Sequence, residues 1–391
     1  MVEETGSPLG ADFAKLIPAL QAEVKPGENV LAYILSQFRR FGHTVEEPRM
    51  LLHLFEQNYD RIIVVTAPRE SWANPAIHDL YQDRIDFYPF ASQELAMIGH
   101  MDKGLMSIGA LDLLLIHDRT LETHFQKSLL GGPMPPLTLP EKISETGQTW
   151  LRTQGIDDDL PLVMLHVRDD SFKINTPASK LREGRIEGYV PAVQWLLEQG
   201  YAVLRLGDCD SPRLSIEHPH LIELSHLDHE AELDVFAAAS CRFAITVSSG
   251  PNSLVSYFNK PRVIANLPLH DFYCPHRMDL IVPKRFTWEA SQEPIEFSDF
   301  CGRRYPELGN AERFVEAGIA IDFSPPEEIL GAVQQMHFML ETDTVSEHAG
   351  VEAFKQIAKT AFIENNDYRF ITLPGGRLAD VSADARPELT R

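Results

Sequence analysis

The amino-acid sequence predicts an α/β protein of two domains, each with a parallel sheet at its centre. Short apolar runs bounded by turn residues alternate with helix-like stretches along most of the chain. This pattern is typical of buried parallel strands and their crossover helices. Residues 131–140, rich in proline and glycine, interrupt the alternation and indicate a linker. The length also favours two domains, because a single core rarely grows beyond roughly 250–300 residues.

The sequence of the first half predicts a βαβ unit, followed by strands and helices that alternate with a less distinct pattern. Residues 1–28 are expected to form a loose or amphipathic leader. The elements expected after it are strands at 29–38, 61–68, 85–88 and 111–117 and helices at 44–57, 74–83 and 92–106. We place the boundary within residues 120–160 and assign residues 1–140 to an N-terminal domain.

The second half predicts its own parallel sheet, in a domain that spans residues 141–340. Gly200 is expected to end one of its helices as a C-terminal cap. The expected elements are strands at 161–168, 201–208, 242–248 and 261–267 and helices at 186–200, 229–240, 252–259, 325–341 and 350–362. We expect residues 341–391 to provide a helix that returns to the domain junction and then a polar, frayed tail.

Composition excludes several classes of function. With 35 Lys and Arg against 57 Asp and Glu, the net charge is −22, which disfavours nucleic acid as a main partner. A polyanionic ligand must therefore meet local arginines or helix N-termini. The cysteines form no C-x-x-C pair, so neither a zinc ribbon nor a redox motif is predicted. The first residues lack the pattern of a signal peptide, and no run of about 18 apolar residues occurs, so a cytoplasmic protein is expected.

Polar residues follow two of the strands predicted for the second domain. His166 and Arg168 end one strand, and Ser248 begins a serine- and glycine-rich turn after another. In parallel sheets, ligands bind outside the carboxyl ends of the strands. The guanidinium fork of Arg168 suits a diphosphate, although a surface ion pair with Asp169 or Asp170 explains it equally. His166, taken by itself, fits a hydrogen-bonded core histidine.

The turn Ser248-Ser249-Gly250-Pro251-Asn252-Ser253 predicts a strand followed by the start of a helix. Proline suits the first helical position, and the free backbone N–H groups of a helix start form an anion site. An ordinary helix cap that uses Ser248 or Ser249 is the alternative.

Three further residues of the second half are candidates for the same ligand. Asp208, at the end of a strand, could accept a hydrogen bond from a ribose or base, or simply cap its loop. Arg182 and Arg185 precede a helix and could help to neutralise a diphosphate, or could be solvated. The segment 270–279 contains two histidines, two aspartates and a cysteine, but its spacing matches no common metal site. An aromatic-rich loop over a base or sugar is favoured over a metal site, and a structural loop is favoured over both.

In the first half, Gly42, His43 and Glu47 are the candidates. Gly42 would let the backbone turn tightly after the first strand. His43 and Glu47, four residues apart, could share a helix face and remove a proton from an acceptor hydroxyl. Two structural interpretations stay open: Thr44-x-x-Glu47 as a capping box, or Pro48 as the first helical residue with Glu47 as its cap.

Together these motifs resemble a known set of enzymes. His166-Val167-Arg168 resembles the H-x-R motif of GDP-fucose-using transferases, in which the arginine contacts the donor diphosphate. The run 166–208, with Arg182, Tyr189 and Gly200–Asp208, is similar to a bacterial family of surface-carbohydrate glycosyltransferases of the GT-B type. Residues 41–52 resemble the G-H-x-x-x-E stretch of that family, and the resemblance covers roughly residues 38–283. Glu183 departs from it, because the family has asparagine there.

The resemblance implies two Rossmann-like domains whose parallel sheets face each other across a cleft, with the donor held by the C-terminal domain. It implies catalysis without an essential metal or cofactor, although Asp208-Cys209-Asp210 has the spacing of a metal-binding D-x-D pair. Arg168, His43 and Glu47 would be catalytic. The residues expected to bind substrates are Gly42, His166, Arg182, Asp208, Ser248, Ser249, Gly250, Asn252 and Ser253.

The expected reaction is transfer of a sugar from a nucleotide-sugar donor, with a GDP-sugar favoured, to a glycan or lipid-linked acceptor in surface polysaccharide biosynthesis. The enzyme would act in the cytoplasm, and peripheral contact at the inner face of the membrane stays open. A sugar-nucleotide epimerase, a heptosyltransferase-like enzyme and a non-catalytic nucleotide-sugar-binding protein also fit these motifs. A dehydrogenase is disfavoured, because no G-x-G-x-x-G follows the first or the sixth predicted strand.

Overall fold

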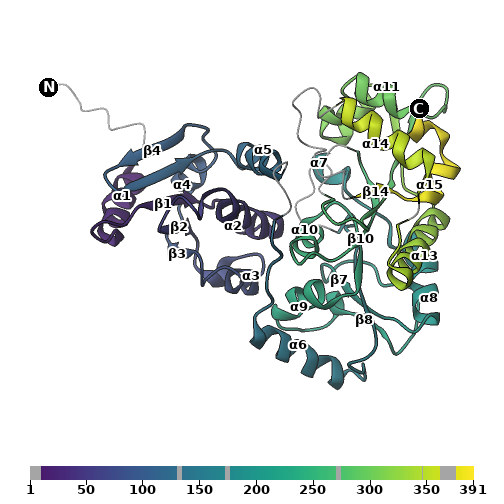
Figure 1. Ribbon diagram of the computed structural model, residues 1–391, viewed down its shortest axis with the longest axis horizontal. Coiled ribbons are helices and arrows are strands. Elements are labelled where there is room, and N and C mark those ends of the chain that lie inside the picture. The colour runs from purple at the N-terminus through teal and green to yellow at the C-terminus, as the bar shows by residue number, and fades with distance from the viewer. Residues whose placement is uncertain (1–9, 130–133, 172–176, 270–273, 346, 362–375) are drawn as a thin grey trace. The chain divides into compact units, whose positions relative to one another are not determined.

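The computed structural model describes residues 10–129, 134–171, 177–269, 274–345, 347–361 and 376–391. The chain forms two units, Met1–Met134 and Pro135–Arg391. Each unit has its own largely parallel sheet with helices packed against it (Figure 1). The predicted α/β class is therefore confirmed. No helix among these described residues is long and apolar enough to cross a membrane.

In the first unit, the described residues form a sheet of five strands in the order β3-β2-β1-β5-β4. The pairs β3-β2, β2-β1 and β1-β5 are parallel, and β4 is antiparallel to β5. The elements are α1 (Ala11–Glu23), β1 (Val30–Ile34), α2 (Phe41–Phe55), β2 (Arg61–Thr66), η1 (Arg69–Ser71), α3 (Pro75–Asp79), β3 (Asp86–Pro89), α4 (Gln93–Ile98), β4 (Gly104–Ile108), β5 (Leu111–Leu115) and α5 (Asp118–Ser128).

The single long helix expected over residues 92–106 is wrong. Helix α4 ends at Ile98, and residues 104–108 form strand β4 instead. Gly104 and Gly109 have φ angles of +83° and +71°, which disfavour a continuing helix and permit the tight turn into β5. Within the described part of the expected leader, residues 11–23 form the amphipathic helix α1, with Phe13, Leu16 and Leu20 buried.

In the second unit, the described residues form a sheet of seven strands in the order β14-β11-β10-β9-β6-β7-β8. Each of these neighbouring pairs is parallel. The strands are β6 (Leu162–His166), β7 (Ala202–Leu206), β8 (Leu221–Glu223), β9 (Phe243–Thr246), β10 (Arg262–Leu267), β11 (Leu280–Pro283) and β14 (Arg377–Leu378). Strands β12 (Arg285–Trp288) and β13 (Ile319–Asp322) form a separate antiparallel pair.

The helices of the second unit cover both faces of this sheet. Successive side chains of a strand point to opposite faces of the sheet, so each strand contributes to two cores. Val163 and Leu165 pack in one core with α8 and α13, whereas Ile264 and Ile281 pack in the other with α11 and α14. The helices are α6 (Glu141–Thr153), α7 (Pro177–Lys180), η3 (Ile186–Tyr189), α8 (Val190–Glu198), η4 (Leu224–His226), α9 (Glu232–Ser240), α10 (Gly250–Tyr257), α11 (Phe297–Gly302), η5 (Tyr305–Leu308), α12 (Ala311–Glu316), α13 (Pro326–Thr342), α14 (Ala349–Ala361), α15 (Asp380–Ala385) and η8 (Pro387–Thr390).

The expected frayed tail is wrong for residues 376–391. Strand β14 pairs with β11, and α15 packs against α13 and α14. The polar composition of this segment suggested exposure to solvent, but two of its arginines are buried with partners inside the unit. Arg377 binds Asp380, and Arg386 donates to the carbonyl oxygen of Pro283 at 2.8 Å.

Helix α6 packs on α9 through a glycine, and this contact leads to a stability prediction. A Cβ atom added to Gly147 would lie 2.1 Å from the ring of Phe236, which is buried. We expect Gly147→Ala to destabilise the protein by about 1–3 kcal/mol despite its better helix propensity, because the backbone or ring must shift. Urea denaturation followed by circular dichroism measures this. Gly302→Ala in α11 is the matched control, since an added Cβ there meets no atom within 4 Å; equal stability losses in both variants would contradict the prediction.

Candidate functional site

The strand order of the first unit creates a topological switch point between β1 and β5. From β1 the chain builds outward through β2 and β3, and it then returns to add β5 on the other side. Ligands of open α/β sheets bind outside the carboxyl ends of the strands at such a point. The chain leaves β1 toward α2, which begins at Phe41, and leaves β5 toward α5, which begins at Asp118.

The residues that follow these two strand ends are in contact. Asp118 Oδ2 accepts a hydrogen bond from Gln37 Nε2 at 3.1 Å and lies 3.5 Å from His43 Nδ1. His43, predicted from the sequence, therefore lies at the switch point. Gln37 and Asp118 were missed, although Asp118 directly follows a predicted strand end, which is the signal that could have found it.

His43 and Glu47 share a helix face, as predicted from their spacing. Nδ1 of His43 lies 2.8 Å from Oε1 of Glu47, and the second carboxylate oxygen accepts a hydrogen bond from the Tyr33 hydroxyl at 2.7 Å. Glu47 and Tyr33 are buried, whereas the His43 side chain is 22% exposed. Because a carboxylate accepts the Nδ1 proton, Nε2 is left as the basic nitrogen of the ring.

Both structural interpretations of this stretch are wrong. Helix α2 begins at Phe41, so Thr44 lies inside it and donates its hydroxyl proton to the carbonyl oxygen of Phe41 at 2.8 Å. Pro48 is also inside the helix. The tight turn expected at Gly42 is wrong as well, because Gly42 is the second helical residue and is not among the glycines with positive φ.

The surroundings of His43 favour its protonated form. Burial acts to lower the pKa of His43, but the hydrogen bond and charge of Glu47, with the charges of Glu46 and Asp118, outweigh burial and raise it. Burial and Glu47 raise the pKa of Tyr33 well above its ordinary value, so this phenol remains a donor to the carboxylate. Tyr33, Glu47 and His43 thus form a chain of hydrogen bonds that orients the imidazole and makes it more basic.

The second unit has its own switch point, between β6 and β9. The chain builds outward from β6 through β7 and β8, and it returns to place β9, β10 and β11 on the other side. His166 ends β6, and Ser249 lies just after β9. Their side chains meet, with His166 Nδ1 3.0 Å from Ser249 Oγ. The structure therefore joins the two polar strand ends that the sequence singled out.

The proton positions of this pair follow from its other contact. Ser249 Oγ donates to the carbonyl oxygen of Val247 at 3.2 Å, so its single proton is used and His166 Nδ1–H is the donor to Oγ. Burial, with the charges of Arg168 and Arg205, lowers the pKa of His166 to about 4. The imidazole is therefore neutral at pH 7 and presents no positive charge of its own.

Helix α10 begins at this switch point without help from its capping side chain. Ser249 is the N-cap residue, but among the described residues its hydroxyl makes no capping hydrogen bond, since it binds His166 and Val247 instead. The interpretation of Ser249 as an ordinary side-chain cap is therefore wrong. Ser248 and Gly250 are half-buried beside it. The first backbone N–H groups of α10 keep their capacity to bind an anion.

Asn252 and Ser253 lie further into the helix and have structural contacts. Asn252 Oδ1 accepts hydrogen bonds from Thr246 Oγ1 at 2.8 Å and Arg262 Nη1 at 3.1 Å, which fastens α10 to β9 and β10. Ser253 is buried, and its backbone N–H donates to the carbonyl oxygen of Ser249 at 3.4 Å. Their proposed substrate contacts stay predictions.

Arg168 and Arg182 lie on backbone segments that the structure ties together. The N–H of Gly184 donates to the carbonyl oxygen of Arg168 at 2.7 Å, which places the loop of Arg182 against the end of β6. Both arginines are half-buried. The carboxylate of Asp169, one of the two partners considered for Arg168, accepts the backbone N–H of Ser171 at 2.9 Å.

Asp208 lies in the exposed turn after β7, where its carbonyl oxygen accepts the N–H of Ser211 at 3.1 Å.

Of the segment 270–279, residues 270–273 lie outside the described residues. In its described part, Asp279 is fully buried against Arg262, at 2.6 Å, so it serves structure. No group of three or more potential metal-ligating side chains occurs within the described ranges.

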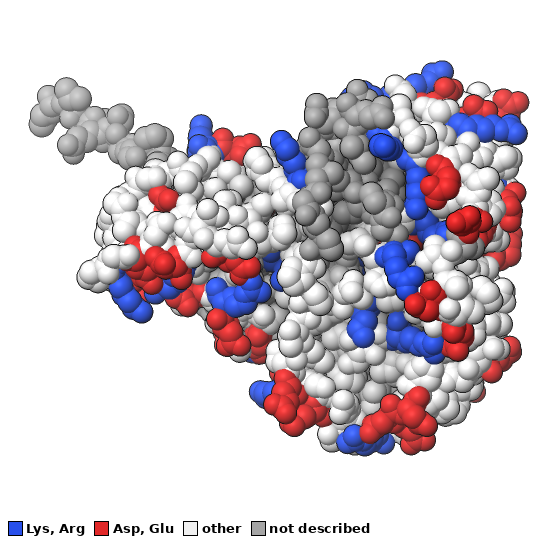
Figure 2. All heavy atoms as spheres, in the orientation of Figure 1, with Lys and Arg blue, Asp and Glu red and all other residues white. Residues whose placement is uncertain are grey.

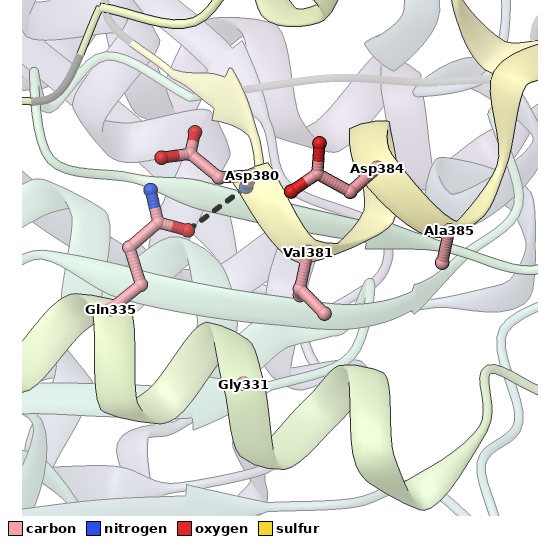
Figure 3. A pocket seen from close by; sticks show the side chains of 6 residues that line it. All are labelled: Gly331, Gln335, Asp380, Val381, Asp384 and Ala385. Carbon is pink, nitrogen blue, oxygen red and sulfur yellow. Dashed lines mark hydrogen bonds between the residues drawn. The ribbon is translucent and has the colours of Figure 1, made fainter.

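Two surface hollows lie away from these clusters. One of about 510 Å³ is lined, in the described part of the chain, by residues of α13 and α15, which are Gly331, Gln335, Asp380, Val381, Asp384 and Ala385 (Figure 3). Another, of about 340 Å³, lies along β2 and β3. Neither contains a candidate residue. On the face seen in Figure 2, basic side chains are interspersed with acidic ones.

No protein-family model and no curated protein matches the chain. Among solved structures, it is similar to the ADP-heptose lipopolysaccharide heptosyltransferase II of E. coli, at 15% identity over 64% of this chain and 78% of that one, with a TM-score of 0.32. It is similar to a family 9 glycosyl transferase from Veillonella parvula, at 10% identity over 61% and 80% of the two chains, with a TM-score of 0.40. The iron-containing dodecameric glycosyltransferase TibC of enterotoxigenic E. coli is similar at 14% identity over 81% of each chain, with a TM-score of 0.41.

These three structures are described as heptosyltransferases or as glycosyltransferases, and none of the three carries the GDP-fucose description that the H-x-R resemblance implies. Their identities and TM-scores are low. Function is therefore inferred from the side chains at the two switch points.

Proposed function

We propose that the protein is a nucleotide-sugar-dependent glycosyltransferase. The observation that carries this proposal is that each sheet has a polar cluster of different chemistry at its switch point. The first unit has a carboxylate-backed imidazole, His43 with Glu47. The second has a neutral histidine, the start of α10 and an arginine-bearing strand end. A base and an anion site are the two parts that sugar transfer from a nucleoside diphosphate requires.

The second unit would bind the donor. The start of α10, at Ser249 and Gly250, supplies backbone N–H groups for a phosphate, and Arg168 supplies a charge-assisted fork. Arg182, on the loop bound to the Arg168 carbonyl, would assist. These cations would stabilise the negative charge that develops on the departing nucleoside diphosphate, so the reaction would proceed without an essential metal.

The first unit would activate the acceptor. Nε2 of His43 takes the proton of an acceptor hydroxyl while that oxygen bonds to the anomeric carbon of the donor sugar. The bond from that carbon to the diphosphate breaks, and its electron pair leaves with the nucleoside diphosphate. Glu47 holds the imidazole in the required tautomer and stabilises the imidazolium that forms. Gly42, in the same first turn of α2, would lie near the acceptor.

The finer parts of the proposal concern substrates and location. A GDP-sugar is the favoured donor, on the sequence resemblance at His166 and Arg168, and an ADP-heptose-type donor is the second candidate. The acceptor would be a glycan or a lipid-linked glycan in surface polysaccharide biosynthesis, met at the inner face of the membrane. An epimerase would alter the donor without any acceptor, and a binding protein would hold it without turnover.

A thermal-shift screen against GDP-, ADP-, UDP-, CMP- and dTDP-sugars tests the donor site. One donor class is expected to raise the melting temperature of the wild type by mass action. In Arg168→Ala, its dissociation constant should rise about 10- to 100-fold, as expected when charge-assisted hydrogen bonds worth about 1.5–3 kcal/mol are lost. Arg152→Ala is the control, because Arg152 is an exposed residue of α6 paired with Asp158. A wild type that binds no donor, or equal responses from both variants, would refute the donor site.

A further inference from the structure

A buried polar frame holds the loop 181–185 at the carboxyl edge of the second sheet. The N–H of Gly184 binds the carbonyl oxygen of Arg168 at 2.7 Å, and Lys284 Nζ donates to the carbonyl oxygen of Glu183, also at 2.7 Å. The loop therefore joins the end of β6 to the end of β11, the strand that Lys284 follows. Arg182 lies between these attachments and the start of the loop.

Close packing beneath the loop fixes its backbone. A Cβ atom on Gly184 would lie 3.1 Å from both the Tyr189 hydroxyl and a methyl group of Val167. Tyr189 accepts a hydrogen bond from Asn266 Nδ2 at 2.9 Å, and Asn266 Oδ1 accepts the N–H of Ser324 at 2.7 Å. The loop thus rests on a connected and buried set of polar contacts, which is the condition for a preorganised site.

Lys284 is an unusual component of this frame, because it is a lysine that is only 3% exposed. Its ammonium nitrogen lies 4.1 Å from the ring centre of Phe323, and the Arg185 guanidinium lies 4.8 Å from the same ring. Burial lowers the pKa of Lys284 to about 7, with Arg185 acting in the same direction and Glu183 and Asp322 opposing. Near neutral pH, this side chain is therefore divided between amine and ammonium.

Lys284 belongs to the same charged cluster as Arg168. Burial raises the pKa of Glu183, and the charges that act on this carboxyl group come from Lys284, Asp170, Lys180 and Arg168. The buried lysine and the arginine assigned to the donor thus both act on the carboxyl group of Glu183. Sequence patterns did not single it out, since the strand 280–283 that precedes it was not predicted.

We infer that Lys284 is a further cation of the donor site and takes up a proton from solvent when the donor diphosphate binds beside Arg168. This inference rests on the proposed function. Two negative charges brought near the buried side chain of Lys284 favour the ammonium over the amine, so binding converts the amine into a charged partner of the diphosphate. Donor affinity is then coupled to pH, and it weakens as rising pH makes that proton harder to acquire.

Isothermal titration calorimetry at pH 8, in buffers of different ionisation enthalpy, tests the inference with GDP-mannose and ADP-glucose as probes. The diphosphate diesters of these probes keep a constant charge between about pH 6 and 9, so proton uptake reports the protein. Since a group of pKa about 7 is about one-tenth protonated at pH 8, the wild type should take up as much as about 0.9 proton per donor bound.

Lys284→Met is expected to lose this uptake and to bind the donor about 10- to 100-fold more weakly at pH 7, because an uncharged side chain replaces a cation. Lys284→Arg keeps a permanent charge, so it should bind the donor without taking up a proton. Lys260→Met is the matched control: Lys260 is half-buried at the opposite, amino end of β10 and should leave both quantities unchanged. Circular dichroism verifies that each variant is folded.

The outcomes separate the two proposals. Donor binding by the wild type without proton uptake overturns the role of Lys284 and leaves the glycosyltransferase proposal intact. The same follows if Lys284→Met retains the wild-type uptake and affinity. If no nucleotide sugar binds the wild type, the proposed function fails, and the role of Lys284 fails with it.

Discussion

Replacing His43 with alanine is expected to lower turnover about 10²- to 10⁴-fold, the usual contribution of a general base, while donor affinity stays within about threefold. The reason is that His43 contacts Glu47 and Asp118 of the first unit, whereas the residues assigned to the donor belong to the second. Steady-state kinetics and donor titrations on the same preparations measure the two effects separately.

The pH profile adds a readout that a purely structural role would not change. His43 acts as a base when neutral, so turnover should rise with pH through its raised pKa. Glu47→Gln removes the charge and hydrogen bond that raise this pKa, so the rise should move to lower pH at a reduced maximum. His53→Ala, on the same helix, is the control, because His53 binds Ser128 and lies outside the cluster. Full activity in His43→Ala would exclude His43 as the general base.

Asp279→Ala is expected to destabilise the protein by about 3–5 kcal/mol, the cost of leaving a buried charge without its partner. Asp279 and Arg262 are fully buried. The carboxylate accepts Arg262 Nη2 at 2.6 Å, Arg262 Nε at 3.2 Å and the Arg262 backbone N–H at 2.9 Å. Chemical denaturation followed by circular dichroism measures the loss. Donor binding should weaken too, since Arg262 Nη1 holds Asn252 at the start of α10.

Two comparisons make this prediction specific. The double variant Arg262→Met/Asp279→Leu replaces the pair with apolar side chains and should recover much of the lost stability. Asp158→Ala breaks the exposed pair with Arg152 and should change stability far less. A stability loss in Asp279→Ala no greater than in Asp158→Ala would show that the buried pair is not essential.

The sequence predicted much of the local structure and part of the candidate site. The α/β class and most strands followed from apolar runs, and His43 with Glu47 followed from helical spacing. The helix expected over 92–106 was wrong because a turn at Gly109 and pairing with β5 outweighed local preference. The tail from residue 376 was wrongly expected to fray because its arginines are paired inside the unit.

Periodicity along the chain, by itself, determined which segments are strands and helices and which polar residues end them, because those features depend on neighbours a few residues away. Strand order was decided only by tertiary structure, since it depends on how whole apolar faces pack. That order joins Ser249 to His166 across 83 residues and Lys284 to Glu183 across 101. A polar residue at a strand end is visible in the sequence, but its partner across a switch point is not.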